Sequence, residues 1–226
     1  MSGAAPRVEV PAVELERRTA RTAVVSLARP EKLNALRPGE VAALRAALRA
    51  AEADESCTAI VIVGKGRSFC AGADVEHKAR LTPDELAEFI ADGRALVDEL
   101  RRSRLVSIAA LHGHVLGGGL ELALACDLRV AAPGAVLGFP ELRRGHLPGW
   151  RGAELLRDAL GGAAALHLLL TGELLDASGA RQLGVVAELA PEGAAQRAVG
   201  LADRIGVHAP ALVAAVKRVT TGSADA

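Results

Sequence analysis

Residues 107–141 have the sequence SIAALHGHVLGGGLELALACDLRVAAPGAVLGFPE, and this stretch decides the fold class. The apolar run at 105–111 (LVSIAAL) predicts a buried strand that ends in the glycine-rich HGHVLGGG, and LELALACD after it predicts a short helix. A strand, a glycine-rich loop and a helix in direct succession indicate an α/β protein.

The same succession occurs twice nearer the N-terminus. Residues 22–28 (TAVVSLA) predict a buried strand, which Arg29-Pro30 ends before a helix at about 38–53. Residues 59–63 (AIVIV) predict the next strand, and the loop GKGRSFCAGAD leads from it to a long amphipathic helix at about 83–102. This recurrence predicts strands that are stacked by repeated crossovers.

The rest of the chain, from Pro148 onward, has mostly helical patterns, with one strand expected near 185–189. No low-complexity segment or second-domain linker is present. We therefore expect three parts: a loose N-terminal tail at 1–10, a core at 11–190, and a short C-terminal helical segment at 191–226.

Composition excludes several classes of protein. Half of the 226 residues are hydrophobic, which is enough for one globular domain, and the 27 basic and 27 acidic residues cancel, so no net field favours nucleic acid or an anionic membrane. We expect neither a secretory signal nor a membrane-spanning segment, because the first residues lack a long apolar run and no later segment has eighteen apolar residues free of charge. The three cysteines (Cys57, Cys70 and Cys126) are too scattered for a disulfide framework, so we expect a cytoplasmic protein.

Two loops, SFCAGADVE at 68–76 and GHVLGGGLELA at 113–123, each follow a predicted buried strand. Glycine lacks Cβ, so a ligand can approach the main chain closely, and N–H groups at a helix start are unpaired. Such donors can form an oxyanion hole, in which one donor lowers a barrier by roughly 3–4 kcal/mol. The alternative is tight helix–strand packing through small residues.

Two carboxylates lie near these loops. Glu121 is flanked by apolar residues in LELALA, and Glu141 follows Phe139-Pro140 at the end of another apolar run. A carboxylate in apolar surroundings is costly to desolvate, which predicts a raised pKa and acid–base chemistry. A surface position, or a partner elsewhere in the protein, is the alternative for each residue.

Other chemical motifs are weak. His112 and His114 would need further ligands to hold a metal, so we expect none. No G-x-x-x-x-G-K-[ST] motif occurs, which argues against nucleoside triphosphate chemistry. No G-x-S-x-G elbow occurs either, which weakens a serine-hydrolase interpretation without excluding hydrolysis of a thioester by water.

Four segments together resemble the enoyl-CoA hydratase/isomerase (crotonase) superfamily in order, spacing and content. They are ARPEKLNAL (28–36), SFCAGADVE (68–76), residues 107–141, and LLLTGELLDASGARQLGVVAEL (168–189). The resemblance extends over roughly residues 13–217, and it implies an α/β fold with a spiral of ββα turns as its core. It also implies an acyl-coenzyme A thioester as the binding partner, with no separate cofactor and no metal, since coenzyme A is part of the substrate.

The resemblance also assigns site residues. The thioester oxygen would lie between the N–H groups of Ala73 and Gly118, and a water molecule would be held by Glu121 and Glu141. Family isomerases generally keep only the second glutamate, so the pair implies a hydratase. Coenzyme A would lie along residues that we expect to bind it: Arg29, Lys32, Leu33, Ala71, Gly72 and Asp74. Arg29 and Lys32 are candidate phosphate partners, with a solvated turn as the alternative.

The sequence departs from the family pattern in two places. Trp150 and Arg151 are bulky where small residues are common, which could reshape the acyl pocket or only the surface. The resemblance also implies further C-terminal helices, which family members usually have and which help to form trimers, after the last residues of this sequence. We expect a homo-oligomer, trimer or hexamer, or assembly with another crotonase-like subunit. The alternatives to hydration are isomerisation, decarboxylation or thioester hydrolysis, or a non-catalytic auxiliary subunit.

Overall fold

The computed structural model describes residues 12–221. The strands are β1 (Val13–Arg17), β2 (Thr22–Leu27), β3 (Ala59–Gly64), β4 (Val106–Leu111), β5 (His114–Leu116), β6 (Leu128–Ala131), β7 (Val136–Gly138), β8 (Leu175–Asp176) and β9 (Glu188–Leu189). The α-helices are α1 (Pro38–Glu52), α2 (Val75–Lys78), α3 (Pro83–Arg102), α4 (Gly118–Ala125), α5 (Gly152–Leu160), α6 (Gly162–Thr171), α7 (Ala177–Gln182), α8 (Ala194–Ile205) and α9 (Pro210–Thr221). Two short 3₁₀-helices, η1 (Pro30–Lys32) and η2 (Glu141–Arg144), complete the set.

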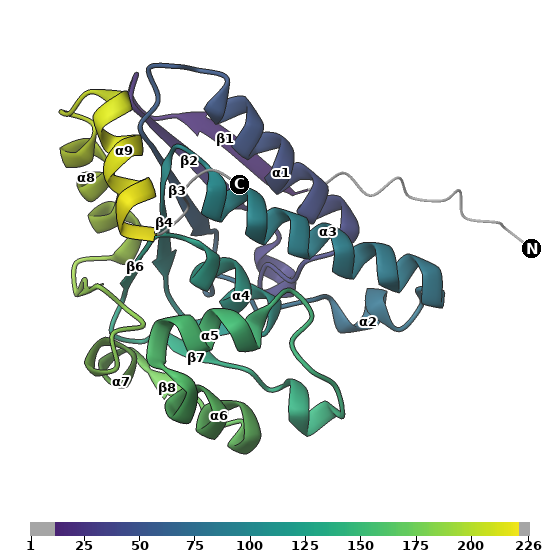
Figure 1. Cartoon of the computed structure of the whole chain (residues 1–226). Helices are drawn as coiled ribbons and strands as arrows, with labels where there is room; N and C mark the ends of the chain where they lie inside the picture. The colour runs from purple at the N-terminus through teal and green to yellow at the C-terminus, as the bar shows by residue number, and fades with distance from the viewer. Residues whose placement is uncertain (1–11, 222–226) are drawn as a thin grey trace, which may run out of the picture.

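The larger sheet has six strands in the order β1-β2-β3-β4-β6-β9. Only the β1–β2 pair is antiparallel; the other neighbours run parallel and are joined by crossovers. Helices α8 and α9 lie on one side of this sheet, and α1 and α3 lie on the other (Figure 1). The repeated crossovers predicted from the sequence are confirmed.

Both faces of the large sheet are buried, and β3 shows how. Ile60 and Ile62 point into the main core, together with residues of α1, α3 and α4. Ala59 and Val61 point to the opposite face, where they meet a row of alanines from α8: Ala194, Ala198 and Ala202. Successive side chains of a strand alternate between faces, so an unbroken apolar run such as AIVIV fits a strand covered on both sides.

A second, three-stranded sheet has the order β5-β7-β8. Isolated parallel bridges pair Leu36 with Ala73 and Cys70 with Val115, and therefore connect the first glycine-bearing loop both to the turn before α1 and to β5. These pairings bring together loops that are far apart in the sequence, and the candidate site lies where they meet.

The predicted helices at 38–53 and 83–102 are confirmed to within a residue. The expected strand at 185–189 is wrong in extent, because only Glu188–Leu189 pairs with β6. Val185 and Val186 are instead buried in the turn after α7, where the Val186 N–H bonds the Ala180 carbonyl at 3.1 Å. Their apolar side chains are buried in the core, although their backbone forms no strand.

The loose tail predicted at 1–10 lies outside the described residues. Within residues 12–221, no single helix is long and apolar enough to cross a membrane. The successive helices α8 and α9 reach that length and composition only as a pair, bent by 110°. α8 packs on the large sheet through its alanine row.

Candidate active site

The two glycine-bearing loops are held side by side by backbone hydrogen bonds. The Cys70 N–H donates to the His114 carbonyl and the Leu116 N–H donates to the Cys70 carbonyl, both at 3.0 Å. Gly72 has φ of +99°, and a Cβ there would come within 2.9 Å of the Leu116 carbonyl oxygen. Only glycine at this position allows the two loops to approach each other so closely.

Two backbone N–H groups at this junction have no acceptor among the described residues and can bind a ligand. In the bridge between Leu36 and Ala73, the bonds are made by the neighbouring groups: Leu36 N–H to Gly72 O at 2.8 Å and Asp74 N–H to Leu36 O at 2.9 Å. Gly118 is the first residue of α4, where an N–H has no partner within the helix. Over residues 12–221, no acceptor bonds the N–H of Ala73 or of Gly118.

A pocket of about 470 Å³ opens at this junction. Its walls come from both glycine-bearing loops, from α3, and from the segment around η2. Ala73, Gly118, Glu121 and Glu141, which the sequence predicts to form one site, all line it. The structure therefore brings the predicted oxyanion donors and both carboxylates together.

Glu121 points from α4 into this pocket and is only 2% exposed. Its Oε1 accepts hydrogen bonds from the N–H groups of Trp150 at 2.6 Å and Gly152 at 2.7 Å. Burial raises the pKa of Glu121 to about 7, although these two N–H donors act in the opposite direction. A carboxyl with this pKa can both accept and donate a proton near neutral pH.

Glu141 begins η2 and is also buried. Its Oε2 has no hydrogen-bond partner among the described residues. Burial raises the pKa of Glu141 as well, and the nearby cations Arg144 and Lys78 partly oppose this. Buried polar side-chain atoms normally have a hydrogen-bond partner, so a buried carboxylate oxygen without one requires an explanation, and a role in catalysis is one.

Trp150 is the bulkiest residue around the pocket. It is 3% exposed and packs edge-to-face on Phe89 of α3, with ring centroids 5.4 Å apart. The sequence left open whether Trp150 and Arg151 alter the pocket or only the surface. The indole of Trp150 lines the pocket, whereas Arg151 is directed outward to Asp98 at 3.1 Å and Glu154 at 3.3 Å.

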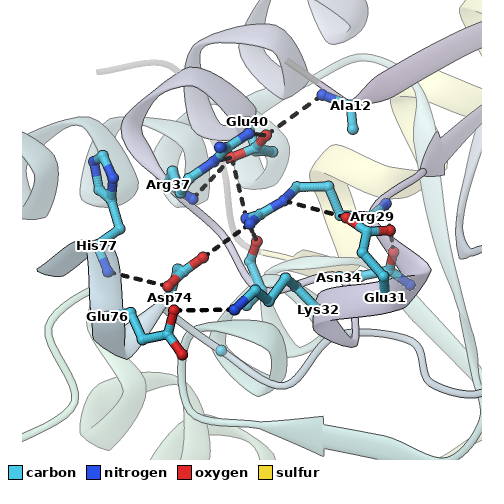
Figure 2. Close-up of polar contacts among 12 residues, drawn as sticks. Ala12, Arg29, Glu31, Lys32, Asn34, Arg37, Glu40, Asp74, Glu76 and His77 are labelled. Carbon is cyan, nitrogen blue, oxygen red and sulfur yellow. Dashed lines mark hydrogen bonds and ion pairs between the residues drawn. The ribbon is translucent and has the colours of Figure 1, made fainter. Parts of the chain in front are cut away.

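Arg29, a predicted phosphate partner, has its guanidinium occupied within the protein (Figure 2). It is 2.9 Å from Asp74, it donates to the Ala35 carbonyl at 2.8 Å, and it lies 3.9 Å from Glu40. Asp74 in turn accepts from the N–H of His77 at the start of α2. Arg29 therefore holds Asp74 in place, and with it the loop that follows Ala73.

Lys32 is the predicted phosphate partner that remains accessible. Its ammonium group is 3.0 Å from Glu76 (Figure 2). The Lys32 side chain is about half exposed, and that of Glu76 is 72% exposed. Leu33 has a left-handed backbone, and its carbonyl accepts from the Ala71 N–H at 3.0 Å. The segments predicted to hold coenzyme A are thus in direct contact.

Sequence reasoning missed Asn34, which organises the same turn. Its side chain accepts from the Arg29 N–H and donates to the carbonyls of Lys65 at 2.9 Å and Ser68 at 2.8 Å. Its φ of +56° is a conformation in which asparagine is enriched, so the Asn after PEKL was an available signal.

His112 and His114 do not form a pair. The His112 ring contacts the Gly66 carbonyl, whereas His114 contacts Ser68. No group of three or more His, Cys, Asp or Glu side chains suited to a metal occurs in the part of the chain that the structure describes.

Comparison with known proteins shows the family to which the chain belongs. The fold is the crotonase spiral: an enoyl-CoA hydratase structure from Thermoplasma volcanium GSS1 matches with a TM-score of 0.87 at 35% identity, over 95% of this chain and 85% of that one. Residues 17–225 match the model of the enoyl-CoA hydratase/isomerase family. The chain belongs to the enoyl-CoA hydratase/isomerase family.

Two relatives indicate the range of named activities. The chain is 38% identical over 186 residues to a Rhizobium meliloti (strain 1021) protein named "Probable enoyl-CoA hydratase", covering 82% of this chain and 72% of the relative. It is 35% identical over 205 residues to an (E)-benzylidenesuccinyl-CoA hydratase of Thauera aromatica, covering 90% and 80% respectively.

Proposed function

We propose that this protein is an enoyl-CoA hydratase, which adds water across the 2,3 double bond of an enoyl-CoA thioester. The observation that carries the proposal is one pocket that holds two buried carboxylates, Glu121 and Glu141. Beside them lie two backbone N–H groups that have no acceptor within residues 12–221. The names of its relatives support the same reaction.

The reaction follows from the positions of these groups. The N–H groups of Ala73 and Gly118 donate to the thioester oxygen and stabilise the negative charge that develops there when the enolate forms. Water loses a proton to one carboxylate as its oxygen bonds to C3, and the other carboxyl delivers a proton to C2. The two carboxyls lie close enough to interact, so neither is assigned as the fixed base.

The coenzyme A moiety lies along the segments that contain Lys32, Leu33, Ala71 and Gly72 in this proposal. Lys32 is half-exposed and suited to a phosphate, whereas Arg29 and Asp74 act by holding the loop. No separate cofactor is required, because the thioester supplies the activating group.

Analysis of the products separates hydration from the alternatives. The purified protein is incubated with crotonyl-CoA in water enriched in ¹⁸O, and the thioester is examined by mass spectrometry. Hydration predicts a hydroxyacyl-CoA that carries the heavy oxygen. Release of free coenzyme A would indicate thioester hydrolysis, and binding without any product would indicate an auxiliary subunit; either result contradicts the proposal.

A homo-oligomer, trimer or hexamer, is part of the proposal, as is a cytoplasmic location. Assembly is supported by exposed apolar side chains on α6 and α9: Leu166, Leu170, Leu212 and Val216. Light scattering should give a mass three or six times that of the 23.2 kDa chain. A monomer at micromolar concentration would contradict this part.

A further inference from the structure

The indole of Trp150 fills the space between α3 and the start of α4. A Cβ added to Gly93 of α3 would overlap the five-membered ring of this indole. A Cβ added to Gly118 would lie 3.4 Å from the six-membered ring. The ring is therefore seated on Gly93 on one side and borders a proposed oxyanion donor on the other.

The backbone around Trp150 is fixed, so the indole has little room to move away. The backbone N–H of Trp150 donates to Glu121, and so does the N–H of Gly152. The preceding residue, Gly149, accepts from the Arg94 guanidinium at 2.8 Å. Edge-to-face packing on Phe89 restrains the ring itself.

The rest of the pocket wall shows where an acyl tail would extend. With the thioester oxygen at Gly118 and the double bond beside the two glutamates, the tail continues toward the remaining apolar lining. That lining consists of side chains from α3 and the segment before α5: Leu86, Phe89, Ile90, Leu147 and Trp150. Because the indole borders Gly118, it would stand at the start of this path.

We infer that Trp150, seated on Gly93, limits the acyl chain that the site accepts and selects short enoyl thioesters. The inference rests on the proposed function, since it takes the thioester to bind between Ala73 and Gly118. A tryptophan at this position occupies volume that several methylene groups would need, and a close-packed interior leaves no slack to accommodate both.

The test compares the wild type with Trp150→Ala on crotonyl-CoA, 2-hexenoyl-CoA and 2-octenoyl-CoA. Each newly buried methylene is worth about fourfold in kcat/KM. The ratio of kcat/KM for octenoyl-CoA to that for crotonyl-CoA should therefore rise at least about tenfold in the variant. Trp150→Phe should shift the ratio less. An unchanged ratio in Trp150→Ala would overturn the inference.

Leu156→Ala is the matched control, because Leu156 is buried in the same core but does not line this pocket. It should destabilise the protein and leave the ratio unchanged. Gly93→Ala should impair all three substrates, because its methyl group needs the space of the indole. The double variant Gly93→Ala/Trp150→Ala should recover turnover; no recovery would contradict the seating of the indole on Gly93.

Binding measurements keep the inference separable from the proposed function. Calorimetry with the saturated thioesters butyryl-CoA and octanoyl-CoA requires no turnover. If no variant hydrates any substrate, the proposed function fails, yet Trp150→Ala should still improve binding of octanoyl-CoA relative to butyryl-CoA by about tenfold. Equal ratios in wild type and variant would reject the inference even if hydration were confirmed.

Discussion

The carboxylate of Glu141 lies directly over Gly117, so that a Cβ added to Gly117 would overlap Glu141 Oε1. Gly117 also has φ of +50° and ψ of −124°, a conformation that is costly for any residue with a side chain. Gly117→Ala should therefore displace the carboxylate, destabilise the protein by about 1–3 kcal/mol and reduce hydration at least tenfold. Thermal unfolding and a steady-state assay measure the two effects.

Gly134→Ala provides the control for this substitution. Gly134 has no neighbouring atom within 4 Å of an added Cβ and no positive φ. Its replacement should change stability by no more than about 0.5 kcal/mol and should not affect turnover. Equal behaviour of the two alanine variants would contradict the placement of Glu141 over Gly117.

The raised pKa of Glu121 predicts a stability that falls as pH rises. The folded state holds a proton up to about pH 7, whereas the unfolded carboxyl loses it near its ordinary pKa of 4.5. Between these values the folded state binds more protons, so the stabilisation present below pH 4.5 is lost as pH rises to about 7. The loss is on the order of 3 kcal/mol.

Glu121→Gln removes this titration and can still accept the N–H groups of Trp150 and Gly152. The melting temperature of the variant relative to wild type should therefore increase from pH 5 to pH 8, by several degrees. The measurement is thermal unfolding of both proteins across that range. A difference that is flat with pH would show that Glu121 is not desolvated in the folded protein.

Replacement of Arg29 by methionine should lower the stability of the protein far more than the same replacement of Lys32. Arg29→Met removes a partly buried cation and leaves the buried Asp74 without this ion pair, which should cost about 3 kcal/mol of stability. Lys32→Met breaks only an exposed pair, so its stability should change by less than about 1 kcal/mol. Binding of acetyl-CoA, followed by calorimetry, should weaken a few-fold in Lys32→Met and become less sensitive to salt. Equal melting temperatures of the two variants would contradict the assignment.

Much of the fold was predictable because its signals are local. AIVIV and LVSIAAL are apolar runs of strand length, and the helix at 83–102 carries both a periodic apolar face and Thr82 as its N-cap. The short strands β5 and β7 were not predictable. Each has three residues, and their pairing depends on contacts between segments that periodicity does not reveal.

The residues of the site were predictable from the sequence, but the residues that hold them in place were not. Glu121 in LELALA signals a desolvated carboxylate, yet no pattern shows that its partners are the N–H groups of Trp150 and Gly152, about thirty residues away. Arg29 is a basic residue in a turn, for which exposure is the usual expectation. Its position between Asp74 and Glu40 depends on residues far apart in the sequence, and only the structure shows it.

The most direct test of the central claim is the conversion of crotonyl-CoA by the purified protein, followed as loss of the conjugated enoyl absorbance, beside Glu121→Gln and Glu141→Gln. We expect turnover by the wild type and a fall of about 10²–10⁴-fold in each variant, because each removes a carboxyl that transfers a proton. Binding of butyryl-CoA should be nearly unchanged in both. Wild-type rates in both variants would contradict the proposed mechanism, and an inactive wild type that still binds butyryl-CoA would contradict hydration of this substrate.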